Sequence, residues 1–283
     1  MKSLWMLVAT LSFAVMAACV KQLSDAYSTG EILFYRCLIS AILVAIYAKA
    51  TQSTLWTPYW REHGRRACFG ASAMGAWYYT LGVLPLATSV TLNYASPIFV
   101  GMLTAYAALR RGDPSDKKLA YLAIVIGFVG VCILLNPTAE MTQAPAIMIG
   151  LLGALVAALS FRDVRRLAQL GEPEVRMVFY FCLFAALFAA IPMALQEKHT
   201  QTLEGMAFLL VIGLFGTIGQ FAVSRAFGLG HVLLSAALQY TGVVFAALIG
   251  FWVWNESLPF EKQLGIATIV FAGLLSAVAA KKS

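Results

Sequence analysis

The sequence predicts an all-α membrane protein with ten transmembrane helices arranged as two inverted repeats of five. Three observations lead to this fold class. The composition is 61% hydrophobic and only 12% charged, with a mean hydropathy of +0.81, whereas soluble domains contain about 25% charged residues. Apolar runs long enough to cross a bilayer follow one another with short connections. The positive charges and an internal similarity both fit a two-fold arrangement of these runs.

The predicted spans alternate with residues that break helices. In 283 residues, spans of about 20 residues and short loops leave room for roughly ten helices. The first five spans cover residues 3–22, 30–49, 66–84, 87–109 and 118–136. The second five cover residues 145–163, 175–195, 205–226, 231–254 and 262–280. The breakers between them include Pro58, Pro85, Pro114, Pro137, Pro173 and Pro259.

The distribution of Lys and Arg predicts the orientation, because cytoplasmic loops carry an excess of both. With a cytoplasmic N-terminus, nearly all of the 20 basic residues fall on the cytoplasmic side. The exceptions are Lys21, Arg36, Lys198 and Lys262. Both termini are therefore expected in the cytoplasm, and the protein in the inner (cytoplasmic) membrane. Binding to nucleic acid would need the basic residues on one face, so no such partner is expected.

The chain also repeats itself. A shift that moves Tyr94 onto Tyr240 (240 − 94 = 146) aligns a long stretch without gaps. Further pairs at this offset are Gly70 and Gly216, Ser89 and Ser235, Asn93 and Gln239, and Phe99 and Phe245. Each half has an odd number of spans, so the second half must be inverted. The expected units are residues 1–137 and 144–283, with a substrate site at their interface.

The fourth span contains a proline near its middle. Pro97 cannot donate a backbone hydrogen bond, and its ring crowds the carbonyl of Asn93. In hydrocarbon a freed carbonyl is costly unless it faces protein or a water-filled cavity. Many transporters build a binding site on such a broken helix, and a packing kink is the alternative. The matching part of the ninth span has no proline, so only the first half is expected to have a sharp break.

Three local stretches, together with the two five-span halves, carry a family resemblance. They are Glu31-Ile-Leu-Phe-Tyr-Arg36, Leu92-Asn-Tyr-Ala-Ser-Pro97 and Asn255-Glu256. The whole chain resembles the drug/metabolite transporter superfamily, specifically its EamA-type members. The resemblance implies a carrier for a small metabolite such as an amino acid, a nucleobase-type metabolite, S-adenosylmethionine, riboflavin or a carboxylate. It also implies a central cavity lined by spans one, three, four, six, eight and nine.

The same resemblance places spans five and ten at the periphery, often at a homodimer contact. One stretch departs from the family pattern. Span six ends in Ser160-Phe-Arg162-Asp163-Val-Arg165-Arg166, where relatives usually keep a polar but less charged run.

Polar and aromatic residues of the predicted cavity are the candidates for substrate binding. Amides inside a membrane usually find a partner or a substrate, and bonding between helices is the alternative. The candidates in spans four and nine are Asn93, Tyr94, Ser96, Gln239 and Tyr240. The aromatic candidates Trp77, Tyr78 and Tyr79 in span three either stack on a ligand or form an interfacial belt. Consecutive helical residues point about 100° apart, so they cannot all face the cavity.

Charged residues near the span ends complete the candidate set. Arg36 lies about two turns into span two, where a charge is functional by default. Its alternative role is snorkelling to the outer surface, towards Glu31. Gln220 and Arg225 in span eight are further candidates for substrate binding. Expected gating or coupling residues are Lys21, Glu31, Pro97, Asp163 and Arg165.

The acidic residues predict transport without a carboxylate relay. Of the 13 acids, only Glu31 and Asp163 touch a predicted span, both near an end, and the histidines are also near span ends. Proton-driven carriers commonly use a buried carboxylate or histidine. The sequence therefore predicts a facilitator or exchanger of a neutral or anionic substrate, with Glu31 as the outer-side proton site. A proton-coupled exporter is the alternative.

Other functional classes fit less well. An intramembrane enzyme needs a nucleophile with its base, paired aspartates, or metal ligands such as HExxH, and the sequence has none of these patterns. The five cysteines form no CxxC pair and are expected to be buried apolar residues. Neither a metal nor a cofactor is predicted. A channel usually needs rings of ligands from several subunits, whereas an inverted repeat indicates alternating access.

Overall fold

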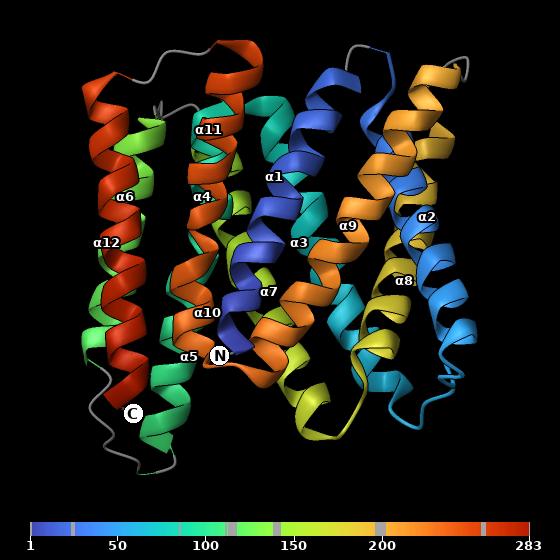
Figure 1. Ribbon diagram of the computed structural model, residues 1–283, viewed down its shortest axis with the longest axis horizontal. Helices are drawn as coiled ribbons and strands as arrows, with labels where there is room; N and C mark the ends of the chain where they lie inside the picture. Colours follow the sequence, from blue (N-terminus) through green and yellow to red (C-terminus); the bar gives the residue numbers. More distant parts are fainter. Residues whose placement is uncertain are drawn as a thin grey trace.

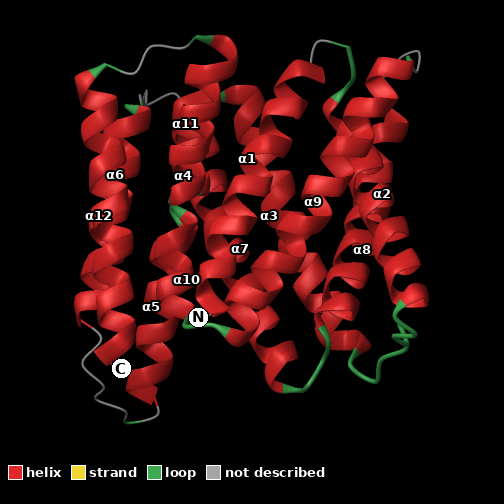
Figure 2. Ribbon diagram, viewed as in Figure 1, coloured by secondary structure: helices red, strands yellow, loops and turns green. Residues whose placement is uncertain are grey.

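The computed structural model describes residues 2–23, 26–84, 86–110, 112, 118–137, 143–195, 202–255 and 259–282. These residues form α-helices joined by short connections, with one short 3-10 helix, η1 (Lys2–Leu4), at the start. No β-strand occurs among them (Figure 2). The side chains of Thr29, Tyr78, Leu81, Gly82, Leu86, Ala87 and residues 280–282 lie outside the description.

The helices follow the predicted spans closely. The first half holds α1 (Trp5–Leu23), α2 (Thr29–Ala50), α3 (Trp60–Val83), α4 (Leu86–Asn93), α5 (Ser96–Arg110) and α6 (Lys118–Leu135). The second half holds α7 (Ala144–Gln169), α8 (Glu174–Leu195), α9 (Leu203–Leu229), α10 (Val232–Gln239), α11 (Thr241–Trp254) and α12 (Phe260–Lys282). Spans four and nine are each divided between two helices.

Nine segments of the described chain are long and apolar enough to cross a membrane, with α4–α5 and α10–α11 each counted as one segment. The helix α3 is not among them, and its first two turns contain Arg61, Glu62, Arg65 and Arg66. Successive segments run in alternating directions through a bundle of upright helices (Figure 1). The protein is therefore a multi-pass helical membrane protein.

The two halves of the chain interleave. The most extensive packing pairs α6 with α12, α3 with α7, α1 with α9, and α2 with α8. In Figure 1 the α6–α12 pair forms one edge of the bundle and α2 with α8 the other. Every pair joins one helix from each half. The interface between the halves therefore runs through the whole bundle.

The α6–α12 contact depends on facing glycines. A Cβ atom at Gly265 would lie 2.8 Å from the backbone nitrogen of Leu134 and 2.9 Å from the carbonyl oxygen of Gly130. A Cβ atom at Gly130 would in turn lie 3.0 Å from the carbonyl oxygen of Gly265. Small residues allow such backbone contact between membrane helices, where dispersion replaces the hydrophobic effect as the main attraction.

The fourth span is interrupted before its proline, as predicted. α4 ends at Asn93 and α5 begins at Ser96. At this break the Ala95 N–H donates to the Leu92 carbonyl at 3.0 Å, which is a tight turn rather than an α-helical bond. Pro97 is the second residue of α5, where a missing N–H leaves no helical bond unmade.

The matching part of the second half is also interrupted, at a single residue, Tyr240, whose backbone stays in the helical region. α10 ends at Gln239 and α11 begins at Thr241. The Thr241 hydroxyl donates to the Leu238 carbonyl at 2.7 Å and lies 2.9 Å from the Thr10 hydroxyl on α1. The Thr241 hydroxyl therefore adds a side-chain hydrogen bond to the carbonyl of the last turn of α10. This interruption needs no proline, which is why the sequence pattern did not reveal it.

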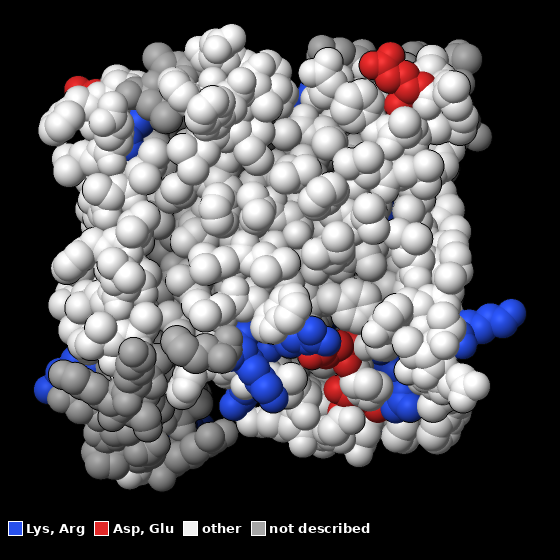
Figure 3. All heavy atoms as spheres, in the orientation of Figure 1, with Lys and Arg blue, Asp and Glu red and all other residues white. Residues whose placement is uncertain are grey.

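Both termini lie at the same end of the bundle, the lower end in Figure 1. On the face drawn in Figure 3, most of the visible Lys and Arg side chains gather towards this end, with acidic side chains beside them. Cytoplasmic loops of membrane proteins carry an excess of Lys and Arg. This gathering of basic side chains agrees with the charge pattern of the sequence, which puts most Lys and Arg on the side of the termini.

Candidate functional site

A narrow crevice lies beside the break in span four. It lies between α3, α4 and α7, and no part of it is wide enough for a water molecule. Its lining residues are Ala73, Trp77, Thr80, Asn93, Gly150, Gly153 and Ala154. Asn93 is half-buried and ends α4. Two predicted substrate-binding residues, Asn93 and Trp77, are therefore brought together by the fold.

Sequence reasoning missed Thr80 as a polar neighbour of this crevice. Its hydroxyl donates to the Trp77 carbonyl at 2.8 Å and lies 2.7 Å from the Ser89 hydroxyl on α4. The hydroxyl pair ties α3 to α4 next to Asn93. Gly150 and Gly153 are three residues apart and therefore lie on one face of α7. This spacing is the one signal in the sequence for the α7 wall of the crevice, opposite Asn93.

The other aromatic candidates of α3 do not line the crevice. Tyr79 is exposed on the outer surface of the bundle, and the side chain of Tyr78 lies outside the described residues. Trp77 is thus the described member of this run that lines the crevice.

Ser96 and Pro97 are buried at the start of α5. Gln220 is half-buried on α9 and does not line the crevice.

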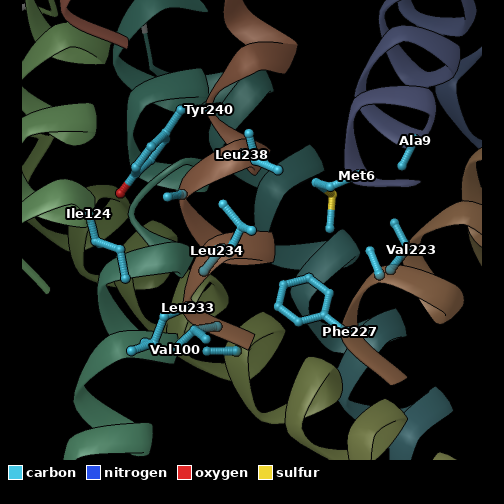
Figure 4. Close-up of a cluster of buried hydrophobic side chains, with 14 of the residues drawn as sticks. Met6, Ala9, Val100, Ile124, Val223, Phe227, Leu233, Leu234, Leu238 and Tyr240 are labelled. Atoms are coloured by element: carbon cyan, nitrogen blue, oxygen red, sulfur yellow. The ribbon is translucent and has the colours of Figure 1, made fainter. Parts of the chain in front are cut away.

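The second break places its polar residues apart from the crevice. Tyr240 is fully buried, and its ring packs on Gly127 of α6, where a Cβ would lie 2.5 Å away. Figure 4 shows its hydroxyl directed towards α6, near Ile124. The Tyr94 ring lies 6.5 Å from the Tyr240 ring, so the two breaks are neighbours. The Oε1 atom of Gln239 is buried without a hydrogen-bond partner.

Arg36 points into the bundle. Its side chain starts on α2, and its Nη1 donates to the Met74 sulfur on α3 at 3.4 Å. Glu31, towards which a snorkelling Arg36 was expected to reach, is buried at the start of α2. There its carboxylate accepts from the Ser28 backbone and hydroxyl, both at 3.0 Å, in a capping box.

A network of charged residues lies where α3 begins and α7 ends. His63 Nε2 lies 2.9 Å from Glu172 Oε2, and Glu172 Oε1 accepts from Arg176 at 2.9 Å. Arg65 binds both oxygens of Asp163, at 2.7 and 2.9 Å. These pairs join α3 of the first half to α7 and to the connection between α7 and α8 in the second. Asp163, predicted as a gating residue, is thus held in an ion pair.

The remaining charged candidates also have defined partners. Arg165 donates to the carbonyls of Gly228 and Gly230, at the end of α9. The ammonium of Lys21 lies 4.2 Å from the centre of the Trp254 ring.

Arg225 binds both oxygens of Glu174, at 2.8 and 2.9 Å. Arg225 lines a separate groove of about 760 Å³ among α1, α2, α8 and α9, away from Asn93.

His63 is predicted to make stability depend on pH. Burial lowers its pKa, and the hydrogen bond to Glu172 opposes this only in part. Its Nδ1 is buried without a partner, so the hydrogen-bond pattern assigns a neutral ring with the proton on Nε2. The charged groups around it are Glu172, Arg66 and Arg176. A depressed pKa means that the unfolded chain takes up a proton before the folded protein does.

The folded state gains its full stability from the neutral His63 ring above about pH 6.5, the ordinary pKa of histidine. This stability is lost as the pH falls from there through the lower pKa of the folded state. The melting temperature in detergent should therefore fall on acidification. His63→Gln keeps a donor for Glu172 and should flatten this dependence, whereas His231→Gln, at an exposed histidine, should preserve it. An unchanged slope in His63→Gln would contradict the assignment.

Membrane-crossing helices with two adjacent breaks and a polar crevice are features of secondary transporters. Comparison with known proteins identifies the group. The model of the EamA-like transporter family matches residues 1–136 and again residues 144–278. The chain belongs to the EamA-like transporter family, and the resemblance expected from the sequence is confirmed.

Several relatives match over nearly their whole length. A Helicobacter pylori (strain J99) protein named "uncharacterized transporter" is 27% identical over 289 residues, covering 97% of this chain and 93% of the relative. The pseudopaline exporter CntI of Pseudomonas aeruginosa (strain UCBPP-PA14) is 28% identical, with 88% and 86% covered. An S-adenosylmethionine uptake transporter of Rickettsia bellii is 25% identical, with 98% and 93% covered.

A solved crystal structure has the same fold. Its TM-score is 0.86 at 17% identity, and the alignment covers 100% of this chain and 99% of the other. The names of the family and of the relatives indicate a transporter of small metabolites rather than an enzyme.

Proposed function

We propose that the protein is a secondary transporter that moves a small polar metabolite across the cytoplasmic membrane by alternating access, as a facilitator or exchanger. The observation that carries this proposal is the pair of broken spans, α4–α5 and α10–α11, which meet inside the bundle. Backbone irregularity at membrane depth is tolerated where it is buried in protein or lines a cavity. The substrate belongs to the amino-acid-like, nucleoside-like or carboxylate-like metabolites.

The proposed mechanism is a rocking of two inverted repeats, residues 1–137 and 144–283. Several features support it. The family model matches each half separately. The contact of α3 with α7 has a counterpart in α9 with α1, as a repeat predicts. Each half also carries a break at an equivalent position. With α3 included the chain has ten spans, and we place both termini in the cytoplasm because the basic residues gather at their end.

The proposed substrate site centres on Asn93 and Trp77, with Gln239 across the neighbouring break. Its amide groups offer both hydrogen-bond donors and acceptors for a polar metabolite. The crevice in this structure is too small for a metabolite, so the site opens when the two halves move apart. A homodimer through the outer faces of α6 and α12 stays a prediction.

Counterflow in proteoliposomes tests this function. The panel contains anionic, zwitterionic and cationic metabolites, with and without a pH gradient. We expect saturable exchange of an anion or zwitterion that is indifferent to the gradient. A lost hydrogen bond worth about 1.4 kcal/mol weakens binding about tenfold, so Asn93→Ala and Gln239→Ala should each raise KM by about that factor.

Thr268→Ala, at an exposed threonine on α12, is the matched control and should transport normally. Unaltered exchange in both Asn93→Ala and Gln239→Ala would remove the site assignment. Flux that does not saturate would count against a carrier. A second candidate function is proton-coupled export, favoured by the buried His63–Glu172 pair. Uptake of a cation driven by the pH gradient would support it instead.

A further inference from the structure

We infer that Arg36 is the receptor for a carboxylate group of the transported substrate. This inference rests on the proposed transport function and narrows its substrate class to carboxylate-bearing metabolites. It concerns a side chain from span two, which the family resemblance does not place at the cavity.

Arg36 is a buried cation without an anionic partner. Its relative exposure is 9%, and it forms no ion pair with any carboxylate in the described chain. Its hydrogen bond goes to the Met74 thioether, which is a weak acceptor. A guanidinium carries five N–H donors and stays charged at every working pH. A buried charge in a membrane helix is expensive and usually functional.

The other arginines that are buried or half-buried are different. Each of them donates to at least one oxygen atom of the protein. The pairs are Arg65 with Asp163, Arg66 with the Met177 carbonyl, Arg165 with the Gly228 carbonyl, Arg176 with Glu172 and Arg225 with Glu174. Arg36 alone among the described, non-exposed arginines has a sulfur atom in place of an oxygen.

The surroundings of Arg36 leave room for its head group inside the bundle. Gly216 of α9 faces the Arg36 side chain. A Cβ atom added to this glycine would lie 3.1 Å from Arg36 Nε and 3.5 Å from the sulfur of Met16 on α1. Met74 is next to Ala73 on α3, and Ala73 lines the crevice at Asn93. The guanidinium therefore lies among α1, α3 and α9, inside the bundle.

The chemistry of the guanidinium selects the ligand. Its planar fork matches the two oxygens of a carboxylate, which can accept two parallel N–H bonds. A carboxamide offers one oxygen and leaves the charge uncompensated, and an ammonium group is repelled. We therefore expect anionic or zwitterionic substrates that orient a carboxylate towards α2.

A stability test separates this role from a structural one, and it needs no knowledge of the substrate. Purified Arg36→Met, without ligand, should melt at the same temperature as the wild type or higher, because the substitution removes an uncompensated buried charge. Arg65→Met is the comparison, since it leaves the buried Asp163 carboxylate without its bidentate partner and should melt lower. A similar fall in Arg36→Met would overturn the inference.

A selectivity test uses matched pairs in counterflow: glutamate with glutamine, aspartate with asparagine, and nicotinate with nicotinamide. The wild type should exchange at least one carboxylate about tenfold faster than its amide, and Arg36→Gln should lose this preference. Arg36→Lys keeps the charge but not the fork and should be intermediate. A preference that survives in Arg36→Gln, or a wild type that favours the amides, would refute carboxylate recognition. No saturable exchange of any compound would instead count against the transport function.

Discussion

Replacing Arg65 with alanine is expected to destabilise the protein by about 3 kcal/mol, the lower end of the range for removing one partner of a buried ion pair. The Asp163 carboxylate is 1% exposed, and its two oxygens accept from Arg65 at 2.7 and 2.9 Å. Without Arg65 this buried charge loses its bidentate partner. The lower end applies because Arg65 itself is 38% exposed and Arg162 lies 3.7 Å from Asp163.

Melting temperatures in detergent, followed by tryptophan fluorescence, measure this effect. Arg162→Ala is the matched control, because its side chain is 54% exposed and should contribute less than about 1 kcal/mol. Asp163→Leu combined with Arg65→Ala should recover part of the loss, since no buried charge then remains unpaired. Equal melting temperatures for Arg65→Ala and Arg162→Ala would argue against a buried pair.

Gly265→Val is expected to be comparably damaging, by about 3 kcal/mol, because it overpacks a contact between two backbones. A Cβ at this position would lie 2.8 Å from the Leu134 nitrogen and 2.9 Å from the Gly130 oxygen. Backbone atoms of a helix cannot rotate away as a side chain can. The substitution must therefore push α6 and α12 apart and expose their facing surfaces.

Gly64→Ala provides the matched control for this contact. Nothing lies within 4 Å of its added Cβ, and alanine is favoured over glycine in a helix by about 1 kcal/mol. It should leave the melting temperature unchanged or raise it. Gly265→Ala should fall between Gly265→Val and the wild type. A wild-type melting temperature for Gly265→Val would mean that α6 and α12 do not meet at these glycines.

The sequence predicted the helices of this protein well because hydropathy and helix breakers are local properties. The apolar runs match α1 to α12 to within a few residues at most boundaries, and the family membership is confirmed. The exceptions also have local reasons. α3 starts at Trp60 rather than at residue 66, because charged residues extend the helix beyond its apolar part. The interruption at Tyr240 contains no proline, so no helix breaker in the sequence marks it.

What the sequence determined by itself was the all-α membrane class, the helix positions and two residues of the crevice, Trp77 and Asn93. The tertiary structure decided where individual side chains point. It turned Arg36 into the bundle, set Tyr240 against Gly127, and joined His63 to Glu172. In a soluble helix an apolar stripe marks the buried face. A membrane helix meets lipid on one side and protein on the other, and both are equally apolar. Only the packing of the folded chain therefore decides which face of the helix is turned to protein.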